Sequence, residues 1–101
     1  MTTKPYQRHI EEDARLVILK ELAAQSDGRA SSTILGHALD AFGHTRSPAW
    51  LLTQLAAMRE LGAIETEEVG SVVIAKITKL GVNHCLRREQ IVGIKQPSLG
   101  A

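Results

Sequence analysis

Apolar residues recur at helical spacing in four stretches of the chain and alternate with polar residues in two others. The clearest helical stretch covers residues 47–61, where apolar positions separated by steps of four and three share one helix face. Those positions are Leu51, Leu55 and Met58. The hydroxyl of Ser47 can cap the first turn, Pro48 suits the first helical position, and Gly62 supplies the left-handed residue that ends a helix. The pattern predicts a helix over residues 47–61 that leads directly into a strand.

Three more segments have helical periodicity. The first begins at His9 with an acidic first turn, which the helix dipole favours, and its apolar residues form two strips. The strips are Ile10, Ala14, Val17, Ile18 and Leu22, and Leu16, Leu19 and Ala23. The second helix is capped by Ser31 or Ser32. Its inward positions are expected at Ile34, Leu35, Ala38, Leu39 and Phe42. The third helix is expected over residues 79–90.

Residues 63–69 and 72–77 alternate between apolar and polar side chains, and Gly70 and Ser71 lie between them. Two alternating runs joined by two turn residues predict a β-hairpin with a tight tip. A very short strand is expected at residues 29–30, before the second helix. These patterns predict an α+β chain that is mostly α, in the order helix, strand, helix, helix, strand, strand, helix.

The spacing of polar caps, aliphatic residues and glycine around the helix at residues 47–61 forms a recognisable signature. Its members are Ser47, Leu51, Leu55, Met58, Gly62 and Ile64. This signature resembles the recognition helix of small bacterial winged-helix regulators of the ArsR and MarR type. The junction after the hairpin resembles the same regulators, through Ile77, Thr78, Leu80 and Gly81. The resemblance covers roughly residues 10–89 and implies a winged helix-turn-helix with a three-helix core, a β-hairpin wing and a C-terminal helix. The small size also suits phage-encoded or prophage-encoded proteins of this fold.

A chain of 101 residues with 44% hydrophobic content can build one domain with a modest core and is too short for a second. Residues 1–8 contain a proline and no periodicity, so a flexible N-terminal arm is expected there. The winged-helix domain is expected over residues 9–90. Residues 91–101 contain glycines and a proline without a clear period, which predicts an extended C-terminal tail. Its apolar side chains are expected to dock on a surface: Ile91, Val92 and Ile94.

Net charge and the absence of targeting signals say little about the fold, but they indicate where in the cell the protein is expected. The formal net charge is +1 and the pI is about 8.0, which neither requires nor excludes a polyanionic partner. The single Cys85 cannot form an internal disulfide, and the N-terminus lacks the apolar core of a signal peptide. No apolar run has the length of a membrane span. A cytoplasmic location without membrane insertion is therefore expected.

The leading functional prediction is a DNA-binding transcriptional regulator without its own sensory domain, in which the helix at residues 47–61 enters the major groove. Side chains on the N-terminal half and solvent face of such a helix reach base edges, and flanking hydroxyl and basic groups hold phosphates. The expected base contacts are Ala49, Trp50, Thr53 and Gln54. The expected phosphate contacts are Arg29, Ser32, Thr33, Thr45, Arg46, Ser47, Ser71 and Lys76. Double-stranded DNA is thus the expected partner.

Two features of the chain favour a protein partner instead. The helix carries Trp50 and Leu52 where regulators of the resembled type usually have basic or amide side chains. The wing carries Glu65, Glu67 and Glu68, and like charges near a duplex weaken phosphate binding. The alternative is a winged-helix adaptor in a bacterial or phage assembly, which binds protein through an apolar patch around Trp50 and Leu52. A further interpretation is that Trp50 packs against the core.

Neither a metal site nor catalytic machinery is expected. The chain has four histidines and one cysteine, but no pair has the spacing of a metal-binding motif, so no metal and no cofactor is expected. No glycine-rich phosphate loop or nucleophile motif is visible, and the acidic residues cluster at helix ends and in the hairpin, as solvated charges do. The chain is therefore expected not to be an enzyme.

A homodimer is expected because the first helix, the last helix and the tail carry more apolar surface than a lone core of this size needs. These three segments would form the interface. Two-fold symmetric dimers of helix-turn-helix proteins bind palindromic half-sites.

Overall fold

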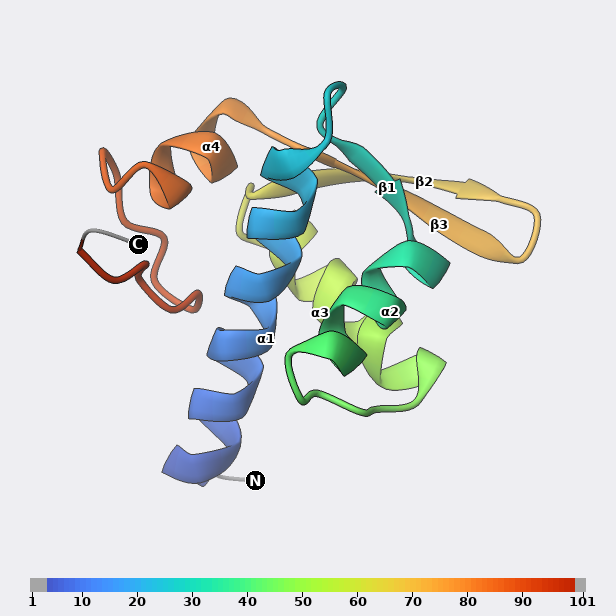
Figure 1. Cartoon of the computed structure of the whole chain (residues 1–101), viewed down its shortest axis with the longest axis horizontal. Coiled ribbons are helices and arrows are strands. Elements are labelled where there is room, and N and C mark those ends of the chain that lie inside the picture. Colours follow the sequence, from blue (N-terminus) through green and yellow to red (C-terminus); the bar gives the residue numbers. More distant parts are fainter. Residues whose placement is uncertain (1–3, 100–101) are drawn as a thin grey trace.

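Helix, strand, helix, helix, two strands and helix follow one another in the computed structural model, which describes residues 4–99 (Figure 1). The helices are α1 (Pro5–Ala24), α2 (Ser32–Ala41), α3 (Pro48–Glu60) and α4 (Lys79–Cys85), and the strands are β1 (Arg29–Ser31), β2 (Ile64–Val69) and β3 (Val72–Ile77). About half of the chain is helical. The predicted α+β class and the predicted order of elements are confirmed.

The three strands form one antiparallel sheet in the order β1-β3-β2. In the β2–β3 hairpin, Ile64 pairs with Ile77 and Glu65 pairs with Lys76. Ile64 is buried, whereas Glu65 and Lys76 are exposed. The two faces of the hairpin therefore alternate as the sequence pattern predicted, because successive side chains of a strand point to opposite faces.

Helix α1 is the central element of the core. Figure 1 shows it running through the middle of the molecule, with α2 and α3 on one side and α4 and the C-terminal segment on the other. The largest fully buried apolar side chains are Ile18, Leu19, Leu22, Leu35, Leu39, Leu55, Met58 and Ile64. They come from α1, α2, α3 and β2, so the burial of aliphatic surface joins all four elements.

Helix α4 sits close to the base of the hairpin because it contains a glycine at the contact. A Cβ atom on Gly81 would lie 2.5 Å from the carbonyl oxygen of Ala63 and 2.8 Å from a methylene carbon of Ile77. Thr78 caps the helix by accepting a hydrogen bond from the Gly81 N–H at 3.1 Å. Its hydroxyl also donates to the carbonyl oxygen of Gly62 at 2.7 Å, which ties the start of α4 to the end of α3.

The expected N-terminal arm is shorter than predicted. Helix α1 begins at Pro5 rather than at His9, so the part of residues 1–8 from Pro5 onward is helical. Proline is favourable at the first helical position, where its missing N–H has no intrahelical partner. Residues 1–3 lie outside the described part of the chain.

Two helix ends also differ from the prediction. Phe42 was expected to face inward, but α2 ends at Ala41 and the Phe42 side chain is 70% exposed. The last helix ends at Cys85 and not at residue 90, because Arg87 adopts a positive φ of 60° that an α-helix does not allow.

The segment after α4 folds back along α1 without further helix or strand up to residue 99. Ile91 and Ile94 are buried, as predicted, whereas Val92 is 82% exposed and does not dock. The buried His84 holds this segment: its Nδ1 accepts a hydrogen bond from the Ile91 N–H at 3.0 Å, and its Nε2 donates to the Lys95 carbonyl oxygen at 2.9 Å. Ile91 and Ile94 anchor the tail to the body, and the chain turns between them, where the Ile94 N–H donates to the Ile91 carbonyl oxygen at 3.2 Å. Across residues 4–99, no helix combines the length and the apolar character needed to cross a bilayer.

Candidate nucleic-acid interface

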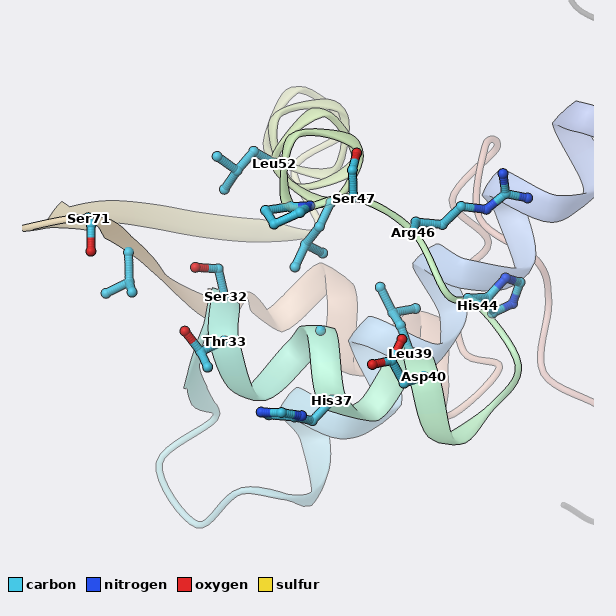
Figure 2. Close-up of a pocket in the computed structure, with 14 residues that line it drawn as sticks. Ser32, Thr33, His37, Leu39, Asp40, His44, Arg46, Ser47, Leu52 and Ser71 are labelled. Carbon is cyan, nitrogen blue, oxygen red and sulfur yellow. The ribbon is translucent and has the colours of Figure 1, made fainter.

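A groove of about 400 Å³ lies where α2, the start of α3 and the tip of the β2–β3 hairpin meet (Figure 2). The polar side chains that line it include Ser32, Thr33, His37, Asp40, His44, Arg46, Ser47 and Ser71, and the apolar ones include Leu39, Leu51, Leu52 and Val72. Figure 2 shows α3 nearly end-on above α2, with Ser71 at the hairpin tip beside them. The groove thus joins five of the predicted phosphate contacts: Ser32, Thr33, Arg46, Ser47 and Ser71.

The first turn of α3 is fixed by its cap. The Ser47 hydroxyl accepts a hydrogen bond from the Trp50 N–H at 3.1 Å. Ala49 and Thr53 are exposed on the outer side of the helix, and the Thr53 hydroxyl donates to the Ala49 carbonyl oxygen at 3.0 Å. Both residues are therefore accessible, and the Thr53 oxygen keeps its capacity to accept a hydrogen bond.

Gln54 is not available to a base, which corrects the prediction for this residue. Its side chain is fully buried: its amide oxygen accepts from Arg15 Nε at 2.9 Å, and its amide nitrogen donates to Glu11 Oε2 at 3.0 Å. The helical spacing contained this signal, because Gln54 lies three residues after Leu51 and four before Met58, both on the buried face.

Trp50 is half-buried and packs against the core, in agreement with the interpretation that it is a packing residue. The Arg46 guanidinium lies over its ring, 5.2 Å from the centroid, within the range of a cation–π contact. A small hollow beside this pair is lined by Gln7, Ile10 and Glu11 of α1. Trp50 therefore faces α1, and as a base contact it is accessible only in part.

The predicted apolar patch around Trp50 and Leu52 is not one surface. Leu52 is 42% exposed and lines the groove on the hairpin side of α3, whereas Trp50 lies on the α1 side. Side chains that are two residues apart on a helix point in directions that differ by roughly 200°, so Trp50 and Leu52 lie on different sides of α3.

Arg29 and Lys76 lie away from the groove, on the outer face of the sheet. They pair across β1 and β3, and Lys76 pairs with Glu65 across β3 and β2. Arg29, Lys76 and Glu65 are therefore neighbours across the three strands, and the exposed Glu67 lies beside them. Neither is brought together with the groove residues.

Of the remaining hydroxyl groups, two accept hydrogen bonds from the backbone and two are exposed. Ser31, not Ser32, caps α2 by accepting from the Ile34 N–H at 3.3 Å. Ser32 accepts from the Val73 N–H at 3.1 Å, which ties the start of α2 to β3. Thr33 and Thr45 are exposed, although Thr45 lies outside the groove.

A cluster around Asp13 fixes the turn between α2 and α3. His44 Nε2 lies 2.6 Å from one carboxylate oxygen of Asp13, and Lys95 Nζ lies 3.3 Å from the other. Burial raises the pKa of Asp13, but the hydrogen bonds and charges of His44 and Lys95 outweigh it, and the pKa falls below the ordinary value of 3.8. Sequence analysis missed this cluster, since its members come from α1, the turn and the tail.

Cys85 is a packing residue of α4. Its side chain is half-buried against the core, and burial raises the pKa of its thiol despite the charge of Lys20. Within residues 4–99, no three His, Cys, Asp or Glu side chains are grouped closely enough to share a metal ion.

Comparison with known proteins finds a relative in a bacteriophage. The chain is 30% identical over 86 residues to the uncharacterized protein gp26 of Escherichia phage Mu. The match spans 85% of this chain and 88% of the phage protein. The chain belongs to the family of phage Mu gp26.

The similarity to gp26 extends over nearly the whole domain, because the match spans most of both proteins. No model of a known protein family matches the chain. No solved structure matches it.

Proposed function

We propose that the chain is a winged helix-turn-helix protein that binds double-stranded DNA, with α3 in the major groove and the β2–β3 hairpin as the wing. The observation that carries the proposal is the groove, where hydroxyl groups from α2, α3 and the hairpin tip and the Arg46 guanidinium line one common space. The element order and the signature that resembles ArsR and MarR regulators support the same fold.

In this proposal, Ala49 and Thr53 face base edges, since they are the exposed predicted readers on α3. Arg46, Thr33 and Ser71 hold phosphates on the two sides of the helix. The chain acts by binding and not by catalysis, as a transcriptional regulator in the cytoplasm of a bacterial host. The phage relative supports a phage or prophage origin.

Fluorescence anisotropy of a labelled random-sequence duplex tests the proposal. Between 50 mM and 200 mM salt, the affinity should fall steeply, because phosphate contacts release counterions. Arg46→Gln should make the slope of log affinity against log salt less steep by about 0.9. Arg59→Gln is the matched control, since Arg59 lies in the last turn of α3 beside Glu60 and should leave the slope unchanged. An absence of binding at 50 mM salt would contradict the proposal.

The adaptor is a second candidate because the apolar side chain of Leu52 is exposed within the groove. Leu52 lies there together with Val72, and the part of β2 next to the hairpin tip carries the exposed Glu67 and Glu68. If this function is right, Leu52→Asp should abolish capture of a protein that wild-type chain and Thr53→Ala both retain. Capture of that protein by Leu52→Asp at the wild-type level would exclude this function.

A further inference from the structure

We propose that the first turn of α1 is an additional phosphate-contacting element, on the side of α3 opposite the hairpin. The inference rests on the proposed DNA-binding function and extends it. It adds Lys4 and Arg8, which sequence analysis left in a flexible arm, to the binding surface.

The hydrogen bonds of Gln54 determine how α1 and α3 lie relative to each other. Gln54 contacts Arg15 and Glu11 of α1, whereas Trp50, one turn earlier in α3, shares a hollow with Gln7 and Glu11. Helices α1 and α3 therefore run in the same direction where they contact each other. The two helices present their N-termini at the same end of the molecule.

Helix geometry brings two basic residues to this end. Arg8 precedes Arg15 by seven residues, which is close to two helical turns, so it lies on the α1 face that contacts α3. Lys4 is the N-cap residue directly before α1 and has an extended backbone. Seven residues span about 10 Å of helix, and the six residues from Gln54 back to Pro48 span about 9 Å. Lys4 and Arg8 therefore lie toward the same end of the molecule as the first turn of α3.

The charges at this end are free to bind a polyanion. Lys4, Arg8 and Arg46 are exposed, and within residues 4–99 none of them forms a salt bridge. The nearby Glu11 carboxylate is engaged, because it accepts from Gln54 and lies 3.8 Å from the Arg15 guanidinium. The N-terminus of α1 adds a favourable dipole beside these side chains.

The two sides of α3 differ in charge. On one side the hairpin exposes Glu67 and Glu68, whereas on the other side α1 offers Lys4 and Arg8. A duplex that receives the start of α3 would therefore gain most of its phosphate attraction from α1, and DNA held in this way would run along the α1 side of the molecule.

The test is the same anisotropy titration with the double variant Lys4→Gln and Arg8→Gln. Glutamine has a helix propensity close to that of lysine and arginine, and it removes their charge. The slope of log affinity against log salt should become less steep by about 0.9 for each phosphate that the variant no longer neutralises, with weaker binding at 50 mM salt. The control double variant is Lys79→Gln with Arg88→Gln, which removes the same charge from exposed residues of α4 and the segment after it.

The outcomes of this experiment distinguish the role of α1 from the proposed DNA-binding function. A less steep slope in the α1 variant but not in the control supports the inference. Wild-type binding with the same slope in the α1 variant, or an equal loss in the control, would overturn it while the proposed function stands. If wild-type protein fails to bind at 50 mM salt, both are overturned. Circular dichroism of the exposed-residue variants verifies that each remains folded.

Discussion

At the scale of single residues, Gln54 is the most consequential position in the chain. Its amide joins Arg15 and Glu11 of α1 to α3, and Arg15 also donates to the Gly93 carbonyl oxygen at 2.8 Å. Gln54 and Arg15 together thus link the first helix, the proposed recognition helix and the tail. Buried polar groups of this kind are expensive to leave unpaired.

Replacement of Gln54 by alanine should therefore destabilise the fold. The change leaves part of the Arg15 and Glu11 side chains without partners, and the expected loss is about 1–3 kcal/mol in the free energy of unfolding. Urea denaturation measures it. The control is Thr53→Ala at the exposed neighbouring position, where a change within about 0.5 kcal/mol is expected. A stable Gln54→Ala protein that no longer binds DNA would mean that the residue contacts a base after all.

At the scale of secondary-structure elements, glycine decides how closely helices approach their neighbours. Gly81 lets α4 meet the backbone at Ala63, because any Cβ there would overlap the carbonyl oxygen at 2.5 Å. Gly36 in α2 has no such restriction, since the nearest atom to its Cβ position is a Leu51 methyl group at 3.8 Å. A close contact therefore requires glycine at position 81 but not at position 36.

Alanine at these two positions should change stability in opposite directions. Gly81→Ala should lower the free energy of unfolding by about 1–3 kcal/mol or more, because it forces α4 away from Ala63. Gly36→Ala should raise it by about 0.5–1 kcal/mol through helix propensity. Thermal and urea denaturation of both variants check the pair. Equal effects would contradict the assigned close contact.

At the scale of the whole molecule, the tail changes the case for a dimer. Ile91 and Ile94 pack within their own chain, so they do not need a second subunit to cover them. Apolar side chains nevertheless stay exposed in two of the three segments predicted to form the interface: Leu86 in the segment predicted as the last helix, and Val92 and Leu99 in the tail. Tyr6, which was predicted to lie in the arm and is at the start of α1, is exposed as well. The homodimer therefore stays a prediction, with a smaller surface than the sequence implied.

Sedimentation equilibrium tests this prediction. Wild-type protein should dimerise, and Val92→Asp should weaken the dimer because it introduces a charge into the apolar interface. Phe42→Ser is a suitable control, since Phe42 is also solvent-facing but lies outside the three segments. A wild-type protein that is monomeric at all concentrations would show the prediction to be wrong.

The groove was only partly predictable. Ser47 and Arg46 were recognised because a helix cap and the turn before it are local features. The pairing of Arg29 and Lys76 with a glutamate on the sheet was not, because it depends on strand register. No local pattern predicted the contact of His44, since its partner Asp13 lies 31 residues away in the sequence.

The sequence by itself determined the elements, their order and the alternation of the hairpin. Apolar spacing, caps at Ser47 and Thr78 and the terminating Gly62 act within a few residues, so they can be read along the chain. Only the tertiary structure decided that Arg15 and Glu11 pair with Gln54, that α1 and α3 begin at the same end, and that the tail closes over α1. Those outcomes depend on contacts between residues as far apart as Arg15 and Gly93, whose geometry no local pattern contains.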